Sequence, residues 1–203
     1  MEIRRKSTRV LAVAGLVAAP LAMSVVGPLS SAAYASQAQT IVNEATAWVG
    51  KVPYCWDGGI TSGPSHGSPV ATQRAEGATN CLSSATVGFD CTGLSLYAVA
   101  QATDGKVVLP HSSAQASGAL AAGGTRITSV SALQPGDLVY FGGSFTNFDH
   151  AGIYLGSGQI VDANVSYRAG SATRPDGVHE EPLSWQYTFV GGVRLPQAAT
   201  LPA

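Results

Sequence analysis

The spacing of apolar residues changes near the middle of this 203-residue chain, and that change constrains the fold more than any other feature. In the first half, apolar residues recur every three or four positions, as on one face of a helix. Residues 36–49 and 91–103 have this spacing, and residues 112–120 are a further short helix candidate. After Gly123 the apolar residues come in short continuous runs, typical of buried strands, at residues 138–141, 151–155, 159–163 and 189–195. Helices followed by an antiparallel sheet, with a tight hairpin at Gly156-Ser157-Gly158, predict an α+β domain.

The first 35 residues have the layout of a secretory signal peptide. A basic segment at residues 4–9 precedes an apolar run from Val10 to Val26. The small residues of Ala33-Tyr34-Ala35 predict cleavage after Ala35. The alternative, a membrane anchor, is disfavoured because the run is short for a spanning helix and Pro20 interrupts it.

Cleavage leaves residues 36–203 with 7 basic and 11 acidic residues, a net charge of about −4. This balance lacks the basic excess of a nucleic-acid-binding protein. No segment after residue 35 is apolar for long enough to span a bilayer. We therefore expect a single secreted domain, residues 36–203, that is monomeric and binds no nucleic acid. Within it, residues 60–88 are rich in Gly, Ser and Thr and read as an irregular surface insertion.

Three cysteines in an exported chain can form one disulfide and leave one thiol. Cys91 lies at the predicted first turn of the helix over 91–103, where the helix dipole and unpaired amide groups favour a thiolate. A reactive nucleophile and a small buried core residue are both compatible with that position.

A thiol nucleophile needs a base, and the base needs an orienting partner. Among the four histidines, His150 opens a predicted strand, and the next strand carries Asp162, a polar residue in an apolar run. A short hairpin brings these two residues near each other, so Cys91, His150 and Asp162 form a candidate acyl-transfer triad. We expect a surface location for His66 and for the polar segment His179-Glu180-Glu181.

Five segments resemble motifs of the NlpC/P60 family of cysteine peptidases, in that family's order. They are Pro53-Tyr54-Cys55-Trp56-Asp57-Gly58-Gly59, Phe89-Asp90-Cys91-Thr92-Gly93-Leu94, Leu109-Pro110-His111-Ser112-Ser113-Ala114-Gln115, Leu133-Gln134-Pro135-Gly136-Asp137-Leu138-Val139-Tyr140-Phe141 and His150-Ala151-Gly152-Ile153-Tyr154-Leu155-Gly156. The resemblance covers most of the chain from about residue 36 to residue 195. It implies a papain-like fold, with N-terminal helices packed on a C-terminal antiparallel sheet.

By this resemblance Cys91 is the nucleophile and His150 is the base. The family's third polar residue, which is more often His, Asn or Gln, falls on Asp162. An aspartate can accept from the imidazole and hold its tautomer. Tyr54 matches a tyrosine beside the oxyanion hole, where its hydroxyl would donate together with the Cys91 amide.

The resemblance also implies substrate contacts at Asp90, Ser112 and Ser113, with Asp90 meeting a free amine. His111 stands where the family often has an arginine that would recognise an acidic group.

The resemblance makes Cys91 the nucleophile, and a disulfide between Cys55 and Cys81 would leave its thiol free. That disulfide would also fix the insertion beside the active site. The other two pairings would consume the nucleophile. We expect the insertion to form a lid or groove wall, and the alternative is a surface loop with two unpaired thiols.

The family cleaves cell-wall peptides. The resemblance therefore implies a secreted or wall-associated bacterial peptidoglycan hydrolase that cuts a peptide bond through a thioester, with a peptidoglycan peptide as substrate and without metal or cofactor. The alternatives are a related amidase or acyltransferase on a non-wall substrate, and a catalytically silent binding module of the cell surface.

Overall fold

The computed structural model describes residues 29–169, 172–174, 176–186 and 188–197. The basic segment and apolar run of the expected signal peptide lie outside these residues. Among the helices of the described residues, none has the length and apolar character needed to cross a membrane.

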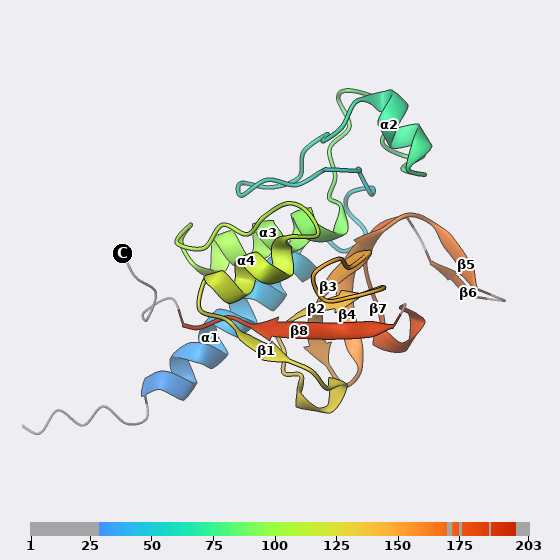
Figure 1. Cartoon of the computed structure of the whole chain (residues 1–203). Helices are drawn as coiled ribbons and strands as arrows, with labels where there is room; N and C mark the ends of the chain where they lie inside the picture. The colour runs from blue at the N-terminus through green and yellow to red at the C-terminus, as the bar shows by residue number, and fades with distance from the viewer. Residues whose placement is uncertain (1–28, 170–171, 175, 187, 198–203) are drawn as a thin grey trace, which may run out of the picture.

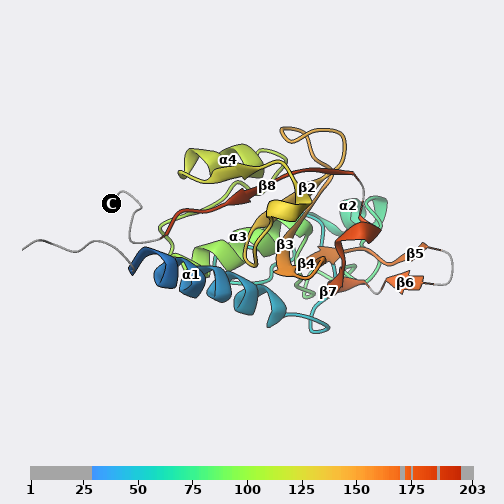
Figure 2. The ribbon, with the colours of Figure 1, turned by 90° about the horizontal axis from the view of Figure 1, so that it is seen from below.

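Three helices form one layer of the fold. They are α1 (Leu29–Thr46), α3 (Cys91–Ala102) and α4 (Gln115–Ala121). Helices α1 and α3 run alongside each other against the sheet (Figure 2). The helix expected over 36–49 thus starts earlier and ends at Thr46. Its last residues form a tighter turn instead, with the Trp48 amide donating to Ala45 and Gly50 at a φ of 69°.

The second layer is a six-stranded antiparallel sheet in the order β1-β8-β2-β3-β4-β7 (Figure 1). Its strands are β1 (Thr125–Ile127), β2 (Leu138–Phe141), β3 (His150–Gly156), β4 (Gln159–Asn164), β7 (Gly177–Pro182) and β8 (Phe189–Arg194). A separate hairpin pairs β5 (Tyr167–Ala169) with β6 (Ala172–Arg174), and two short 3-10 helices cover residues 130–132 and 183–185. The α+β prediction is confirmed, with the four expected strands among those observed.

The sequence of strand β2 is apolar without interruption because both faces of the strand are covered. Leu138 and Tyr140 belong to the core cluster that α1 and α3 also enter. Val139 and Phe141 pack on the other face, in a second cluster that includes Ile160 of β4. The core therefore lies on both sides of the central strands.

The turn between β3 and β4 is as short as the sequence indicated. Ser157 and Gly158 both have positive φ, 52° and 74°, which is the backbone of a two-residue hairpin turn. The register sets Ile153 opposite Val161 and Tyr154 opposite Ile160. His150 and Asp162 consequently lie on the same face of the sheet as diagonal neighbours.

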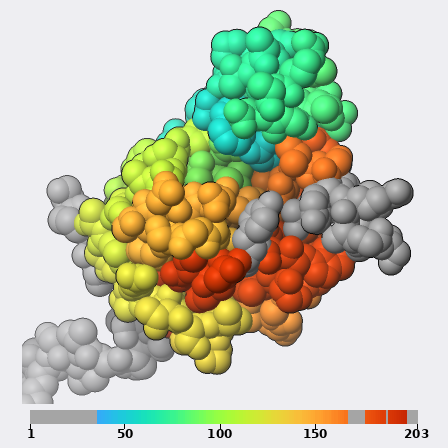
Figure 3. Space-filling view, turned by 45° about the vertical axis from the view of Figure 1, so that its right-hand side comes forward, coloured from blue at the N-terminus to red at the C-terminus, as the bar shows by residue number. Residues whose placement is uncertain are grey.

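The insertion at residues 60–88 contains a short helix, α2 (Val70–Ala75), and forms a lobe that stands out from the rest of the surface (Figure 3). Cys55 and Cys81 form the expected disulfide, with a Cα–Cα distance of 5.4 Å. The fully buried Gln73 accepts from the Trp56 amide at 2.7 Å and donates to the carbonyls of Trp56, His66 and Ser68. The insertion is therefore an ordered unit anchored to the segment after Tyr54.

His66 is half-buried and not a plain surface residue. The side chain lies inside the insertion, with Nδ1 at 3.0 Å from the Thr86 carbonyl and 3.6 Å from the Cys81 sulfur. A lobe closed by a disulfide creates a small interior of its own, which composition did not reveal.

Candidate active site

Cys91 is the first residue of α3, and Asp90 caps that helix. Asp90 Oδ1 accepts from the Gly93 amide at 2.7 Å and from the Thr92 hydroxyl at 3.0 Å. Gly93 is required here, because a Cβ at this position would lie 1.9 Å from the Gly58 carbonyl oxygen. The start of α3 thus packs directly on the backbone before the insertion, and it holds a half-buried free thiol.

His150 and Asp162 form the tightest side-chain pair near this thiol. Nε2 of His150 lies 2.5 Å from Oδ2 of Asp162, and both residues are buried. Because Asp162 engages Nε2, Nδ1 is the nitrogen left to serve Cys91. The structure therefore brings together the three residues that the sequence nominated from positions 91, 150 and 162.

The environment of His150 favours its protonated form. Burial lowers the pKa of His150, but the Cys91 charge, the Asp162 carboxylate and a hydrogen bond with Cys91 together raise it to about 10. A histidine that keeps its proton beside a cysteine is one half of a thiolate–imidazolium pair. Such a pair supplies both a nucleophile and a proton donor.

Cys91 opens into a cleft of about 990 Å³. Its lining comes from several stretches of the chain: residues 54–57, Glu76 of the insertion, and residues 90–92, 111–113, 147–150, 164–165 and 185–186. Four carboxylates line it, those of Asp57, Glu76, Asp90 and Asp149, and no lysine or arginine of the described residues does. The cleft is therefore open, and its carboxylates give it an acidic lining.

Tyr54 lines the same cleft from its buried end. Burial first, and then the negative charges of Cys91 and Asp90, raise the pKa of Tyr54 well above its ordinary value. The backbone of Tyr54 is fixed by its amide, which donates to Asp176 Oδ1 at 3.0 Å. The hydroxyl consequently stays protonated and can act as a hydrogen-bond donor.

The Asp90 carboxylate makes more hydrogen bonds within the protein than the sequence suggested. Besides its two capping bonds, it accepts from the Asp57 amide at 3.0 Å and pairs with His111 Nε2 at 2.8 Å. An incoming amine would compete with these partners. Ser112 and Ser113 are exposed and line the cleft.

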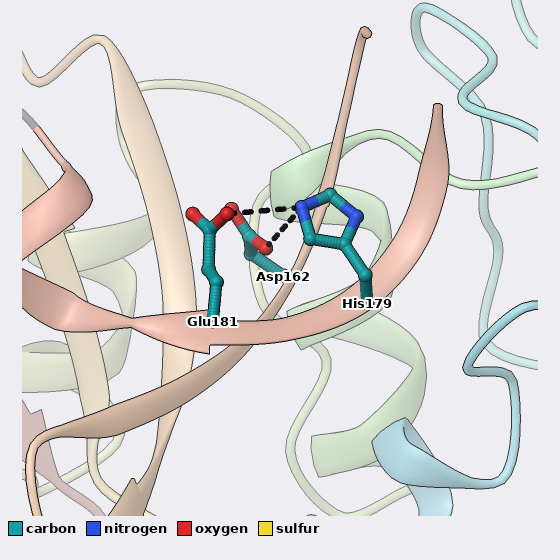
Figure 4. Close-up of side chains that lie close together, drawn as sticks. All are labelled: Asp162, His179 and Glu181. Carbon is teal, nitrogen blue, oxygen red and sulfur yellow. Dashed lines mark hydrogen bonds and ion pairs between the residues drawn. The ribbon is translucent and has the colours of Figure 1, made fainter. Parts of the chain in front are cut away.

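The expectation that His179-Glu180-Glu181 is a solvated surface segment is wrong for two of its three residues. The segment belongs to β7, which pairs with β4 so that His179 lies opposite Asp162. His179 and Glu181 are buried and Glu180 is exposed. His179 and Glu181 converge on the Asp162 carboxylate (Figure 4).

Sequence reasoning also missed three residues at the far rim of the cleft, Asn164, Trp185 and Gln186. Gln186 Nε2 donates to Asp162 Oδ2 at 3.0 Å, and Asn164 Nδ2 lies 3.5 Å from His150 Nε2. Trp185 is half exposed. A tryptophan in a polar segment was the one signal that could have indicated a binding rim.

Comparison with known proteins gives a consistent result. The model of the NlpC/P60 family matches residues 50–190. The peptidoglycan endopeptidase RipA of Mycobacterium tuberculosis is 37% identical over 112 residues, which are 55% of this chain and 19% of RipA. The peptidoglycan endopeptidase RipB of the same organism is 34% identical over 122 residues, 60% of this chain and 41% of RipB. The chain thus matches about a fifth of the length of RipA and less than half of RipB.

Solved structures give the same family. The peptidoglycan hydrolase RipB has a TM-score of 0.57 at 27% identity, covering 86% of this chain and 74% of that chain. RipD of M. tuberculosis, described as a non-catalytic NlpC/p60 domain protein adapted to peptidoglycan binding, has a TM-score of 0.53 at 26% identity, covering 78% and 96%. The resemblance that five motifs predicted is confirmed, and the chain belongs to the NlpC/P60 family.

Proposed function

We propose that this protein is a secreted peptidoglycan hydrolase that cleaves a peptide bond in stem peptides or cross-bridges of the bacterial cell wall. The observation that carries the proposal is the meeting of Cys91 with His150, backed by Asp162, in an open cleft. The relatives named as peptidoglycan endopeptidases support the substrate class.

In the proposed reaction the Cys91 thiolate attacks the carbonyl carbon of the scissile bond. The amide of Cys91, which has no acceptor within its own helix, and the Tyr54 hydroxyl donate to the oxyanion. His150 gives its Nδ1 proton to the leaving amine, and a thioester remains on Cys91. His150 then takes a proton from water, whose oxygen attacks the thioester and releases the carboxylate product and Cys91.

The charges of the cleft favour a substrate with a positive group. Asp57 and Asp149 are exposed at its rim, and Glu76 extends from the insertion. A stem peptide with a free side-chain amine would meet this field favourably, because unlike charges attract across a partly enclosed cleft. Such an amine is present on the diamino acid of many cell walls.

The test is digestion of purified peptidoglycan followed by mass spectrometry of the released muropeptides. We expect residues 36–203 to release peptide fragments, and we expect Cys91→Ala and Cys91→Ser to release none while keeping the fold by circular dichroism. Full activity of Cys91→Ala would overturn the mechanism.

The likeness to RipD favours one alternative, a silent module that binds peptidoglycan. Alkylation by iodoacetamide separates the two, because a silent module has no reason to keep a reactive thiolate. We expect rapid labelling of Cys91 near neutral pH and slow labelling in His150→Ala, which lacks the imidazolium. Slow labelling in both, together with peptidoglycan binding without cleavage, would favour the silent module.

Export and processing belong to the same proposal. Cleavage after Ala35 would fall within α1 and remove its first residues, Leu29 to Ala35. The retained part begins at Ser36 and includes the buried residues Ala38, Ile41 and Ala45. The helix would therefore keep its core contacts, and N-terminal sequencing of the secreted protein should find Ser36.

The insertion is proposed as one wall of the substrate groove. It contributes Glu76 to the cleft, and through Gln73 it holds Trp56, which also lines the cleft. Shortening the insertion while keeping the disulfide should change the preference among muropeptides. An unchanged preference among muropeptides in a folded variant would show that the insertion is not a wall of the substrate groove.

A further inference from the structure

We propose that His179 is a positioning residue for the reaction: a doubly protonated imidazole that holds the Asp162 carboxylate through Oδ1, the oxygen that His150 does not use. This inference rests on the proposed function for its effect on turnover. The protonation state that it assigns can be measured independently of any substrate.

The proton on Nδ1 of His179 follows from its partner. Nδ1 lies 2.9 Å from the Gly177 carbonyl oxygen. A carbonyl oxygen can only accept, so Nδ1 must carry a hydrogen and donate. The tautomer of this ring is thereby determined by the backbone of its own strand.

The proton on Nε2 follows from the two carboxylates that face it. Nε2 lies 3.2 Å from Oε2 of Glu181 and 3.4 Å from Oδ1 of Asp162 (Figure 4). If Nε2 had no proton, its lone pair would point at two negative oxygens. With a proton the ring carries a positive charge, and both contacts become attractive.

Burial makes the difference between these two states large. The exposed fractions of the side chains are 8% for His179, 0% for Asp162 and 1% for Glu181. Charges in such an environment are weakly screened, so a repulsive arrangement would be expensive and an attractive one effective. The pairing of β4 with β7 holds the ring in this position.

The consequence for the proposed triad lies at Asp162. Its Oδ2 accepts from His150 at 2.5 Å and from Gln186 at 3.0 Å. Its buried Oδ1 makes no hydrogen bond within the described part of the chain, and it faces His179 Nε2. The positive ring thus fixes the orientation of the carboxylate that in turn fixes His150.

Asp162, His179 and Glu181 also have the donor types of a divalent-metal site, with ligand atoms within 4.8 Å of one another. The same cluster can therefore be occupied by a proton or by a metal ion. We propose the proton, because a proton on His179 Nε2 faces both Oε2 of Glu181 and Oδ1 of Asp162 without any further group, while Oδ2 of Asp162 is already used by His150 and Gln186.

The functional test compares His179→Leu with His179→Gln, using Glu180→Gln as the matched control on the exposed face of the same strand. We expect Leu to lower kcat by about 10- to 100-fold, the range for losing an outer-shell partner, with KM within about twofold. Gln, whose amide can donate to Asp162, should recover most of kcat, and the control should equal wild type. A folded His179→Leu with wild-type kcat would overturn the proposal, as would a Gln variant no better than Leu.

The protonation state is tested by long-range proton–nitrogen NMR of the imidazoles, in the Cys91→Ala protein at pH 7. We expect both nitrogens of His179 to be protonated, and a neutral ring with hydrogen on Nδ1 alone would overturn the proposal. This measurement needs no turnover and no mutation at 179, so it decides the question even if the variants misfold or the substrate differs. Finally, Zn²⁺ at micromolar concentration should not raise the melting temperature, and a rise in wild type that His179→Leu abolishes would assign the cluster to a metal instead.

Discussion

Removal of the disulfide between Cys55 and Cys81 should destabilise this protein by an amount that can be calculated from its position. The bond joins residues 26 positions apart. Both cysteines are fully buried. Alanine replacement leaves no unsatisfied polar group, because the disulfide sulfurs are not strong hydrogen-bonding groups and His66 Nδ1 keeps the Thr86 carbonyl as its partner. The perturbation is Cys55→Ala with Cys81→Ala, made in a Cys91→Ala background so that no free thiol can exchange.

The magnitude follows from loop-closure entropy. For a closed loop of this size, the crosslink removes freedom from the unfolded chain equivalent to roughly 3.5 kcal/mol at 25 °C. The loss of two buried sulfur atoms adds a smaller contribution of the same sign. For a domain of this length we expect the melting temperature to fall by roughly 7–14 °C.

The assay is urea unfolding of the Cys91→Ala protein with its disulfide intact, compared with the triple variant, by far-UV circular dichroism and tryptophan fluorescence. Trp56 lies beside the disulfide and Trp48 packs against the main core. Versions in which the other two of the three tryptophans are replaced by Phe therefore report on each region separately. If the insertion opens first, the Trp56 signal will change at lower urea than circular dichroism.

Equal unfolding midpoints for the two proteins, with equal dependence on urea, would refute the reasoning. That result would mean that Gln73 and its four hydrogen bonds already close the loop without the disulfide. A destabilised Trp56 signal with an unchanged global midpoint would restrict the effect of the bond to the insertion.

Three further predictions concern the triad and the oxyanion site. Asp162→Asn should keep substantial hydrolysis, because its amide oxygen still accepts from His150. Asp162→Leu should lower the rate of hydrolysis by about two or more orders of magnitude. Unchanged turnover in the Leu variant would show that Asp162 is only a paired polar residue of its strand. Because the pKa of His150 is raised to about 10, hydrolysis should fall as pH rises through that value, when His150 can no longer protonate the leaving amine. The same raised pKa makes the free energy of unfolding depend on pH. The contribution of protonated His150 is complete below pH 6.5, the ordinary pKa of a histidine, and is lost as pH rises toward about 10. An NMR titration showing His150 neutral at pH 8 would contradict both statements. Tyr54→Phe should lower kcat by about 100- to 1,000-fold without changing the melting temperature, since it removes one oxyanion donor. An equal kcat would limit Tyr54 to packing.

Local patterns in the sequence were sufficient for a large part of this fold. The apolar run at 138–141 and the hairpin at 156–158 are the observed β2 and β3–β4 turn, because strand burial and turn geometry depend on neighbouring residues. The position of Cys91 at a helix start was also visible, since its capping partner Asp90 is adjacent in the chain. The family motifs then indicated which cysteines would pair.

Only the tertiary structure decided the environment of Asp162. In β7, His179 and Glu181 point inward and Glu180 outward, so the alternation of a strand is present but its inward residues are polar. A rule that reads polar residues as exposed assigns this segment to the surface, as the sequence prediction did. Burial of such residues is stable only when partners satisfy them, and the partner here comes from β4 through long-range strand pairing. The sequence could thus nominate three residues of the site, but the charges surrounding the third depend on contacts between distant segments.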